Sequence, residues 1–220
     1  MCSQLISEKQ VWRIVESFEF TNEELLFLRE NPISEESKWD NKKYKPIKDR
    51  IRKHYFEKQN FTCAYCRLPI NIGTDNLEIE HVVDKNNRSD FTFEPLNLVV
   101  SCHRCNFAKS TKKVLHACPP PNTYPTGSDS FKIIHSHFDD YFEHIEFIRG
   151  SIYHALTDKG DFTIEKCGLE REGLAEQREE IVKYQDDPII AKVIELRNSG
   201  MNEALLDDIL QQLNNIKKNE

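Results

Sequence analysis

Two pairs of cysteines are spaced so that they could hold a metal ion. Each pair has the form Cys-x-x-Cys, and together they comprise Cys63, Cys66, Cys102 and Cys105. A tight turn of this form presents two thiolates side by side, so two turns complete the tetrahedral coordination that Zn²⁺ prefers. Four sulfur ligands leave no open position, and the predicted zinc is therefore structural. Thiol redox chemistry is the alternative, but two pairs that flank two short apolar stretches favour zinc.

A second group of polar residues lies between and beside these cysteines. Glu80 and His81 interrupt one apolar stretch. Asn97 stands inside the next, and Asn106 directly follows the last cysteine. A histidine side chain titrates near neutral pH and can accept a proton from water. Carboxylate and amide oxygens are ligands that Mg²⁺ prefers, so these residue types are suited to a metal-assisted hydrolysis.

The order of these features resembles that of the HNH endonucleases. The shared pattern is a Cys-x-x-Cys, an acidic residue before a histidine after an apolar strand, Asn-Leu, and a second Cys-x-x-Cys followed by Asn-x-x-Lys. In this chain the four elements are Cys63–Cys66, Glu80-His81, Asn97-Leu98 and Cys102–Lys109. The resemblance implies an α+β fold built on a treble-clef-like ββα-metal module with a structural zinc. It also implies an endonuclease that hydrolyses DNA phosphodiester bonds.

The same resemblance implies a role for each polar residue. His81 would take the proton from the attacking water, and Glu80 and Asn106 would hold a catalytic Mg²⁺ or Mn²⁺. Asn97 would hold the loop that carries His81. The chain departs from the family at two positions, because Asp84 stands where many members have proline and Asn106 stands in place of a histidine. An amide oxygen at position 106 favours Mg²⁺ or Mn²⁺ over a softer metal.

Other interpretations of these residues stay open. The module could be a zinc-dependent adaptor that binds nucleic acid or a protein without cutting, or a stand-alone restriction or homing enzyme. Later histidines could form a second metal site, although strand and surface positions also explain them; these are His135, His137, His144 and His154. His103 could replace a cysteine as a zinc ligand, but the four cysteines suffice.

Charge is distributed unevenly along the chain. The net charge is −7, yet residues 42–113 carry 15 Lys and Arg against 8 Asp and Glu, and all other residues carry 15 against 29. A basic central region indicates contact with a polyanion such as DNA, and the acidic remainder indicates another role. The predicted phosphate contacts, which add affinity without sequence preference, are Arg67, Arg104, Lys109, Lys112 and Lys113.

Apolar periodicity predicts three helices up to the first cysteine pair. The first covers residues 7–20, where apolar residues recur three and four positions apart. The second begins at Thr21, which has capping-box spacing to Glu24, and ends before Pro32. The third is the basic amphipathic segment at residues 42–58.

Alternating apolar residues and residues that interrupt regular structure predict the elements within and after the module. Alternating β-branched residues predict strands at residues 77–83 and 96–100, followed by a helix at residues 106–116. A triple proline at residues 119–121 then marks a boundary. Beyond it the predicted elements are strands at 131–138, 144–148 and 152–156, a turn at 149–151, a helix at 163–184 and a last helix from Asn202.

These elements predict three regions. Residues 1–45 form an N-terminal helical segment, and residues 46–118 form the HNH module. Residues 119–220 form a mixed, mainly helical C-terminal region with a β-hairpin, which we expect to dock a partner.

The flanks of the module resemble a narrower group, the HNH proteins of the Septu and retron-associated anti-phage systems (the PtuB group). The segments that carry this resemblance are Lys45–Lys48, His137–Ile145, Thr157–Gly160 and Thr163–Leu169. The resemblance implies the nuclease of a defence complex, with the acidic C-terminal region docked on an ATPase of the ABC/SMC type. The sequence has no Walker A loop, so control by ATP would come from that partner.

The sequence also bears on location. No apolar run is long enough to cross a bilayer, and the N-terminus lacks the features of a secretory signal. A cytoplasmic protein is therefore predicted, with no membrane partner. Thiols stay reduced in that compartment, which agrees with cysteines that act as metal ligands and with Cys2, Cys118 and Cys167 as free thiols.

Overall fold

Two small antiparallel sheets and a set of short helices make up the described part of the chain. The computed structural model describes residues 12–33, 39–70 and 77–185. Contacts divide the chain into two units, of which the second comprises residues 149–151 and 172–220 and the first comprises all others. The mixed α+β fold predicted from the sequence is confirmed. Among the described residues, no helix combines the length and apolar character needed to span a bilayer.

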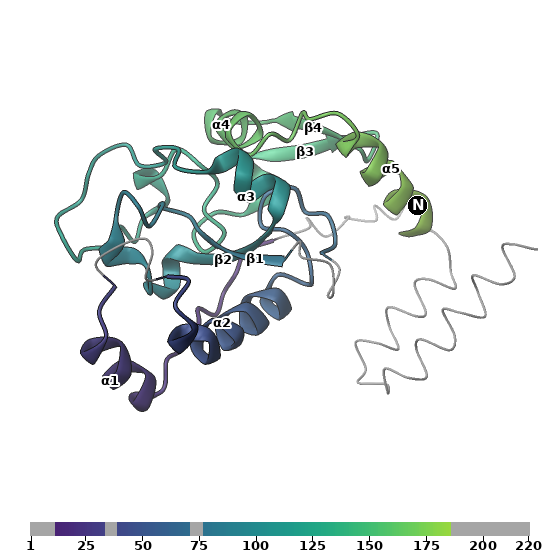
Figure 1. Cartoon of the computed structure of the whole chain (residues 1–220). Helices are drawn as coiled ribbons and strands as arrows, with labels where there is room; N and C mark the ends of the chain where they lie inside the picture. Colours follow the sequence, from purple (N-terminus) through teal and green to yellow (C-terminus); the bar gives the residue numbers. More distant parts are fainter. Residues whose placement is uncertain (1–11, 34–38, 71–76, 186–220) are drawn as a thin grey trace, which may run out of the picture. The chain divides into compact units, whose positions relative to one another are not determined.

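The first sheet carries the residues of greatest interest. Strand β1 (Leu77–His81) pairs antiparallel with β2 (Leu98–Cys102), so the end of β1 lies opposite the start of β2. Figure 1 shows helix α2 (Lys45–Lys58) on one side of this hairpin and α3 (His103–Lys109) on the other. Both predicted strands are present, but the first ends two residues earlier than predicted and the second starts and ends two residues later. The hairpin places its histidine at one end and its cysteine at the other.

Helix α2 turns an apolar stripe toward the hairpin. Ile47, Ile51 and Tyr55 recur every four residues and are buried, as the sequence predicts. The Tyr55 hydroxyl donates to the Pro95 carbonyl at 2.6 Å and accepts the Phe18 amide at 3.0 Å. One side chain therefore ties the helix both to the segment before β2 and to the N-terminal segment.

The segment before the first helix is extended, where the sequence predicted a helix over residues 7–20. Its described part, residues 12–20, contains no helical turn, and the rest lies outside the described residues. Ile14 donates its amide to the Ser136 carbonyl at 2.7 Å, and Trp12 donates its amide to the Asp140 carboxylate at 3.0 Å. Backbone groups must find partners, and here a remote segment supplies them, so tertiary pairing overrides helical periodicity.

Helix α1 (Asn22–Glu30) confirms the predicted start at Thr21. The Thr21 hydroxyl accepts the Glu24 amide and the Glu24 carboxylate accepts the Thr21 amide, which is the reciprocal capping box. The helix ends before the following proline, as expected. Its apolar residues do not reach the core, because Leu25 is 48% exposed and Leu26 is 53% exposed.

Helix α3 begins and ends earlier than the predicted residues 106–116. Cys102 is its N-cap, so the helix starts within the second cysteine pair. Ser110 has φ 43° and donates its amide to the Asn106 carbonyl. This left-handed residue ends the helix at Lys109, because an L-residue in that conformation cannot continue a right-handed helix.

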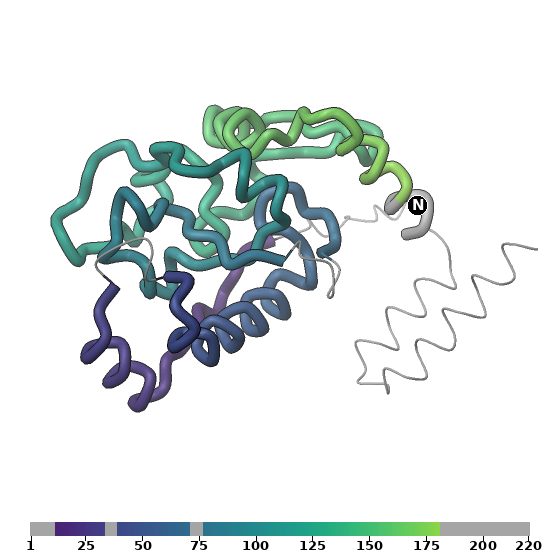
Figure 2. The backbone as a smooth tube through the Cα atoms, in the orientation of Figure 1, coloured from purple at the N-terminus to yellow at the C-terminus, as the bar shows by residue number. Residues whose placement is uncertain are grey.

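The connection from α3 to the second sheet is long and irregular, as Figure 2 shows. The strand predicted at residues 131–138 is absent, apart from an isolated bridge between Leu115 and Phe131. The Asp139 carboxylate instead accepts the His135 amide at 2.6 Å. Side-chain bonds of this kind fold the segment into turns, which compete with strand pairing.

The second sheet confirms the predicted C-terminal hairpin. Strand β3 (Ile145–Ile148) pairs antiparallel with β4 (Ile152–Ala155). Helix α4 (Asp158–Lys166) follows, with Thr157 as its N-cap.

The helix predicted at residues 163–184 is divided in two. Helix α4 ends at Lys166, and helix α5 (Leu174–Gln185) belongs to the second unit. Gly168 and Gly173 lie between them with φ +61° and +78°, which interrupts the helical backbone. The last helix predicted from Asn202 lies outside the described residues.

Candidate active site

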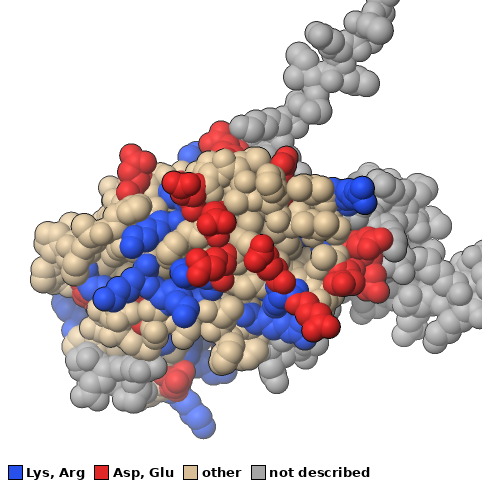
Figure 3. Space-filling model, turned by 90° about the horizontal axis from the view of Figure 1, so that it is seen from above, with Lys and Arg blue, Asp and Glu red and all other residues tan. Residues whose placement is uncertain are grey.

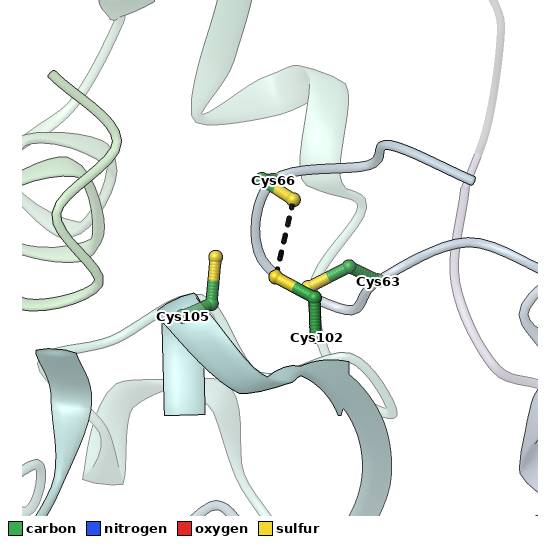
Figure 4. Close-up of side chains that lie close together, drawn as sticks. All are labelled: Cys63, Cys66, Cys102 and Cys105. Carbon is green, nitrogen blue, oxygen red and sulfur yellow. Dashed lines mark hydrogen bonds between the residues drawn. The ribbon is translucent and has the colours of Figure 1, made fainter. Parts of the chain in front are cut away.

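The four cysteines form a single cluster, as predicted. Their sulfur atoms all lie within 4.8 Å of one another, and Cys66 and Cys102 are 3.9 Å apart (Figure 4). Tetrahedral Zn–S bonds of about 2.3 Å place sulfurs roughly 3.8 Å apart, so the geometry fits a zinc ion. Cys63 and Cys66 come from the turn after α2, whereas Cys102 and Cys105 come from the junction of β2 and α3. A zinc held here would join these segments.

A basic residue lies against the cysteine cluster. The Arg171 guanidinium donates to the Cys105 sulfur at 3.5 Å. Four thiolates around one Zn²⁺ would carry a net negative charge, which this guanidinium would partly neutralise. The segment after α4 thereby places a positive charge beside the cysteine cluster.

His81 is buried at the end of β1 with one ring nitrogen fixed. Its Nε2 lies 3.1 Å from the Thr92 carbonyl oxygen. A carbonyl only accepts, so Nε2 carries the proton and Nδ1 keeps its lone pair in the neutral ring. Burial lowers the pKa of His81 to about 3, and the Trp39 ring packs against it with centroids 4.7 Å apart. The ring is therefore a neutral imidazole of defined tautomer.

Asn97 holds the two sides of the loop that follows His81. Its side-chain oxygen accepts the Val83 amide at 2.7 Å, and its side-chain nitrogen donates to the carbonyls of Val83 and Phe91, both at 3.0 Å. Asn97 itself is fully buried. Asn97 thus connects Val83, two residues after His81, with Phe91, which directly precedes the Thr92 carbonyl that meets the His81 ring.

Glu80 is buried and paired. Its carboxylate lies 2.5 Å from the Lys109 ammonium and accepts the Tyr65 hydroxyl at 3.2 Å. Burial raises the pKa of Glu80, and the adjacent Lys109 charge opposes that rise. Lys109 also donates to the His81 carbonyl at 2.9 Å, so one ammonium group connects the two residues of the Glu-His pair.

Glu78 is a site residue that the sequence prediction missed. Its carboxylate accepts the Asn106 side-chain amide at 2.5 Å and lies 2.7 Å from Nδ1 of His103. Residues two apart on a strand share a face, so Glu78 lies on the same face as Glu80. This two-residue spacing is the sequence signal that could have identified Glu78, because the family pattern includes only Glu80.

One groove brings these residues together. Its volume is about 440 Å³, and both predicted metal ligands, the predicted base and Glu78 line it. Basic and aromatic side chains line it as well, namely Lys48, Arg52, Lys85, Trp39 and Phe107. Two further acidic residues, Asp40 and Asp84, line it too. The groove therefore combines an imidazole, carboxylate and amide oxygens, and basic side chains.

The donor set in the groove fits a hard divalent cation. Mg²⁺ and Mn²⁺ are held by carboxylate and amide oxygens and keep several waters. Glu78 and Asn106 are already in contact, and Glu80 lines the same groove. No sulfur is among these groups. The chemistry of these side chains therefore fits an oxygen-rich cation site.

The five residues predicted to contact phosphate lie in different surroundings. Lys109 is 1% exposed and is the counter-ion of Glu80, which corrects its prediction as a phosphate contact. The Arg67 guanidinium lies 3.3 Å from the centroid of the Trp12 ring. Arg104 is exposed, and Lys112 and Lys113 line a separate pocket.

The basic excess of residues 42–113 does not produce a continuous basic surface on the face drawn in Figure 3. Figure 3 shows one face on which Lys and Arg side chains are interspersed with Asp and Glu side chains. The groove that the predicted base lines has basic side chains in its walls, namely Lys48, Arg52 and Lys85.

The alternative metal site at the later histidines is not formed by the described residues. His135 Nε2 lies 2.9 Å from the Tyr124 hydroxyl, and His137 Nε2 lies 3.1 Å from the Leu98 carbonyl. His103 contacts Glu78 and is not part of the cysteine cluster. Within residues 12–33, 39–70 and 77–185, the four cysteines are the one group of three or more His, Cys, Asp or Glu residues whose ligand atoms lie close enough together to hold a metal ion.

Comparison with known proteins points to the same module. Residues 63–112 match the family model described as HNH endonuclease. The matched span starts at the first cysteine of the cluster and contains His81, Asn97 and Asn106. A search of curated proteins found no match. The HNH resemblance seen in the sequence is supported for this domain, which indicates a nuclease that acts on nucleic acid.

Proposed function

We propose that this chain is a metal-dependent endonuclease that hydrolyses DNA phosphodiester bonds. The observation that carries the proposal is the neutral His81 ring, whose Nε2 is bound to the Thr92 carbonyl in the groove that Glu80 and Asn106 also line. The HNH family match covers these same residues. A nucleic-acid substrate is further supported by the basic side chains in the groove.

The proposed reaction begins with the free nitrogen of His81. Nδ1 accepts a proton from a water molecule as the water oxygen forms a bond to phosphorus. The bond from phosphorus to the leaving oxygen breaks, and that oxygen takes a proton from solvent. Mg²⁺ or Mn²⁺, when bound, would neutralise charge on the phosphate and the leaving oxygen. Oxygens of Glu80 and Asn106, together with Glu78, would hold the ion.

Two kinds of side chain in the groove are proposed to bind the strand. Lys48, Arg52 and Lys85 would contact phosphates, which supplies affinity independent of sequence. Phe107 is 78% exposed and lies one residue beyond Asn106. A phenyl ring at this place can stack on a base next to the cleaved phosphate, because every base offers a flat face.

The cellular role is proposed from the sequence resemblance. Segments around the module resemble the HNH proteins of Septu and retron-associated defence systems, and residues outside 42–113 are acidic overall. We propose that the chain is the nuclease of an anti-phage complex and that its C-terminal region, residues 119–220, docks an ABC/SMC-type ATPase in the cytoplasm.

The proposal is tested by incubating the purified chain with supercoiled plasmid. Nicked or linear products are expected with Mg²⁺ or Mn²⁺ and none with a chelator that removes these ions. A second arm adds the protein encoded beside it, with ATP. Binding of DNA without product under any metal, alone or with the neighbour, would favour a zinc-dependent adaptor and contradict the proposed function.

A further inference from the structure

We infer that Tyr124 and His135 are positioning residues for His81, although both lie outside the span that matches the HNH model. The inference rests on the proposed function only where it treats His81 as the catalytic base; the positioning of the His81 ring does not depend on it. Its basis is a chain of hydrogen bonds that begins at His135 and ends at the loop around His81.

Each bond in this chain has one possible direction. The His137 amide lies 3.3 Å from Nδ1 of His135 and must donate to it, so Nε2 of the neutral ring carries the proton. Nε2 then donates to the Tyr124 hydroxyl oxygen at 2.9 Å, and that hydroxyl donates to the Asn97 side-chain oxygen at 3.1 Å. Burial lowers the pKa of His135 well below its usual range, which keeps the ring neutral.

Asn97 connects these hydrogen bonds to the backbone around His81. The oxygen that accepts the Tyr124 hydroxyl also accepts the Val83 amide, two residues after His81. The nitrogen of the same side chain donates to the Phe91 carbonyl, one residue before the Thr92 carbonyl that accepts from His81. The orientation of the Asn97 amide therefore determines the backbone on both sides of the catalytic ring.

Tyr124 supports an orientation of Asn97 that the backbone also selects. The Val83 amide can only donate and the carbonyls of Val83 and Phe91 can only accept, so the oxygen and nitrogen of the Asn97 side chain must stand where they do. The Tyr124 hydroxyl, which accepts from His135, donates its proton to the same oxygen. Removal of that hydroxyl would leave the buried Asn97 oxygen with one hydrogen-bond partner fewer.

The His135 end of this series of hydrogen bonds is packed among aromatic rings. His135 is 0% exposed, stacks on Phe138 with ring centroids 4.2 Å apart and an interplanar angle of 20°, and lies 4.3 Å from the Phe131 ring. The His135 amide donates to Asp139, which the Lys159 ammonium meets at 3.0 Å. A satisfied network in such a low-dielectric region is rigid, so it can hold a loop that would otherwise move.

The first test compares two tyrosine-to-phenylalanine variants of the full chain. Tyr124→Phe removes the hydroxyl that meets Asn97, and Tyr44→Phe removes a buried hydroxyl that donates to the Asn31 carbonyl at 2.8 Å. For Tyr124→Phe we expect kcat to fall by roughly tenfold or more with KM unchanged, because small misplacement of a reacting group is costly. Tyr44→Phe should retain the wild-type kcat.

A second readout needs no cleavage. In protein with ¹⁵N-labelled histidine, the wild-type His81 ring should give one protonated Nε2 signal and one unprotonated Nδ1 signal. In Tyr124→Phe the two signals should move toward each other as the Thr92 bond is lost for part of the time, while zinc content stays at the wild-type level. His135→Gln, which keeps an N–H donor, should retain more of the wild-type ring spectrum than His135→Leu.

Two results would overturn the inference. One is a Tyr124→Phe protein whose His81 ring spectrum matches that of Tyr44→Phe. The other is an equal loss of kcat in both variants, which would indicate general destabilisation. A wild-type chain that shows the expected ring spectrum but cuts no DNA would contradict the proposed function and support the positioning of His81.

Discussion

The surroundings of His81 supply an imidazole that is neutral and oriented. Burial lowers its pKa to about 3, so the ring is uncharged at neutral pH. The Thr92 carbonyl keeps Nε2 protonated. A general base must offer an unprotonated nitrogen before it can take a proton, and here this form is the resting state of the protein.

At the scale of residues, the role of Glu78 can be tested separately from cleavage. Glu78→Gln removes a negative oxygen from the groove and keeps the side-chain shape. We expect Mn²⁺ affinity to fall by about 10- to 100-fold, the range typical of groups that support a metal site. Calorimetric titration with Mn²⁺ on zinc-loaded protein measures this directly.

The control for this variant is Glu146→Gln, which changes an exposed carboxylate on β3. It should bind Mn²⁺ as the wild type does. If Glu78→Gln and Glu146→Gln bind Mn²⁺ equally well, Glu78 is not part of the cation site.

Sequence reasoning reaches the residues of the site only where side-chain type carries the signal. His81 and the four cysteines could be predicted because imidazole and thiol groups at fixed spacing are informative. The Thr92 carbonyl could not, because any residue offers a backbone carbonyl and the fold alone selects this one. Lys109 was predicted to contact phosphate because its charge was visible in the sequence and its burial was not.

At the scale of elements, helix α3 serves several purposes on its different sides. Cys105 belongs to the cysteine cluster, Asn106 meets Glu78, and Lys109 is buried against Glu80. Phe107 remains on the exposed side. A helix of seven residues thus connects the cysteine cluster to the groove.

Phe107 should contribute to binding and not to folding. We expect Phe107→Ala to weaken binding of an oligonucleotide by roughly fivefold, the lower end of the loss for one stacked base. Fluorescence of a 2-aminopurine base placed beside the cleavage position reports the stacking. The melting temperature should stay unchanged because the side chain is exposed.

Leu26→Ala is the matched control, since Leu26 is an exposed apolar residue of α1 outside the groove. It should bind the oligonucleotide like the wild type. Equal affinity of Phe107→Ala and wild type would refute stacking by this residue.

Packing of α4 depends on the absence of a side chain at one position. A Cβ atom on Gly160 would lie 2.0 Å from the His144 carbonyl oxygen. We expect Gly160→Ala to lower the free energy of unfolding by about 1–3 kcal/mol, as overpacking does. Urea denaturation measures the change, and Gly127→Ala serves as the control because its Cβ would meet nothing within 4 Å. Equal stability of the two variants would show that α4 does not need this close contact.

Elements with local signals were predicted well, and elements held by remote partners were not. The capping box at Thr21 and the apolar stripe of α2 lie within one segment each, so the sequence determines them locally. Residues 12–20 carry helical periodicity, yet the Ser136 carbonyl and other remote groups hold them extended. No local pattern contains that information.

At the scale of the whole molecule, buried neutral histidines make stability depend on pH. Burial lowers the pKa of His137 to about 4, and His135 is lowered as well. An unfolded histidine titrates near ~6.5, so the unfolded chain binds more protons between these values. Stability from this source is complete above pH ~6.5 and decreases as the pH falls toward ~4.

We expect the free energy of unfolding to fall by about 2 kcal/mol or more between pH 7 and pH 5, because each proton that only the unfolded chain binds contributes roughly 1.4 kcal/mol for every tenfold rise in proton concentration. Urea denaturation across this range, with zinc present, measures the slope. His137→Gln should show a shallower slope, and His154→Gln, an exposed position on β4, should not. An identical slope in His137→Gln and wild type would exclude His137 as a source of the dependence.

The most direct measurement is the rate of plasmid nicking by His81→Ala with Mg²⁺ present, alongside wild type and His154→Ala. Removal of the base should reduce the rate by at least about 100-fold, while zinc content and far-UV circular dichroism match the wild type and His154→Ala cuts normally. Nicking by zinc-loaded His81→Ala at the wild-type rate would contradict the role of His81 as the base.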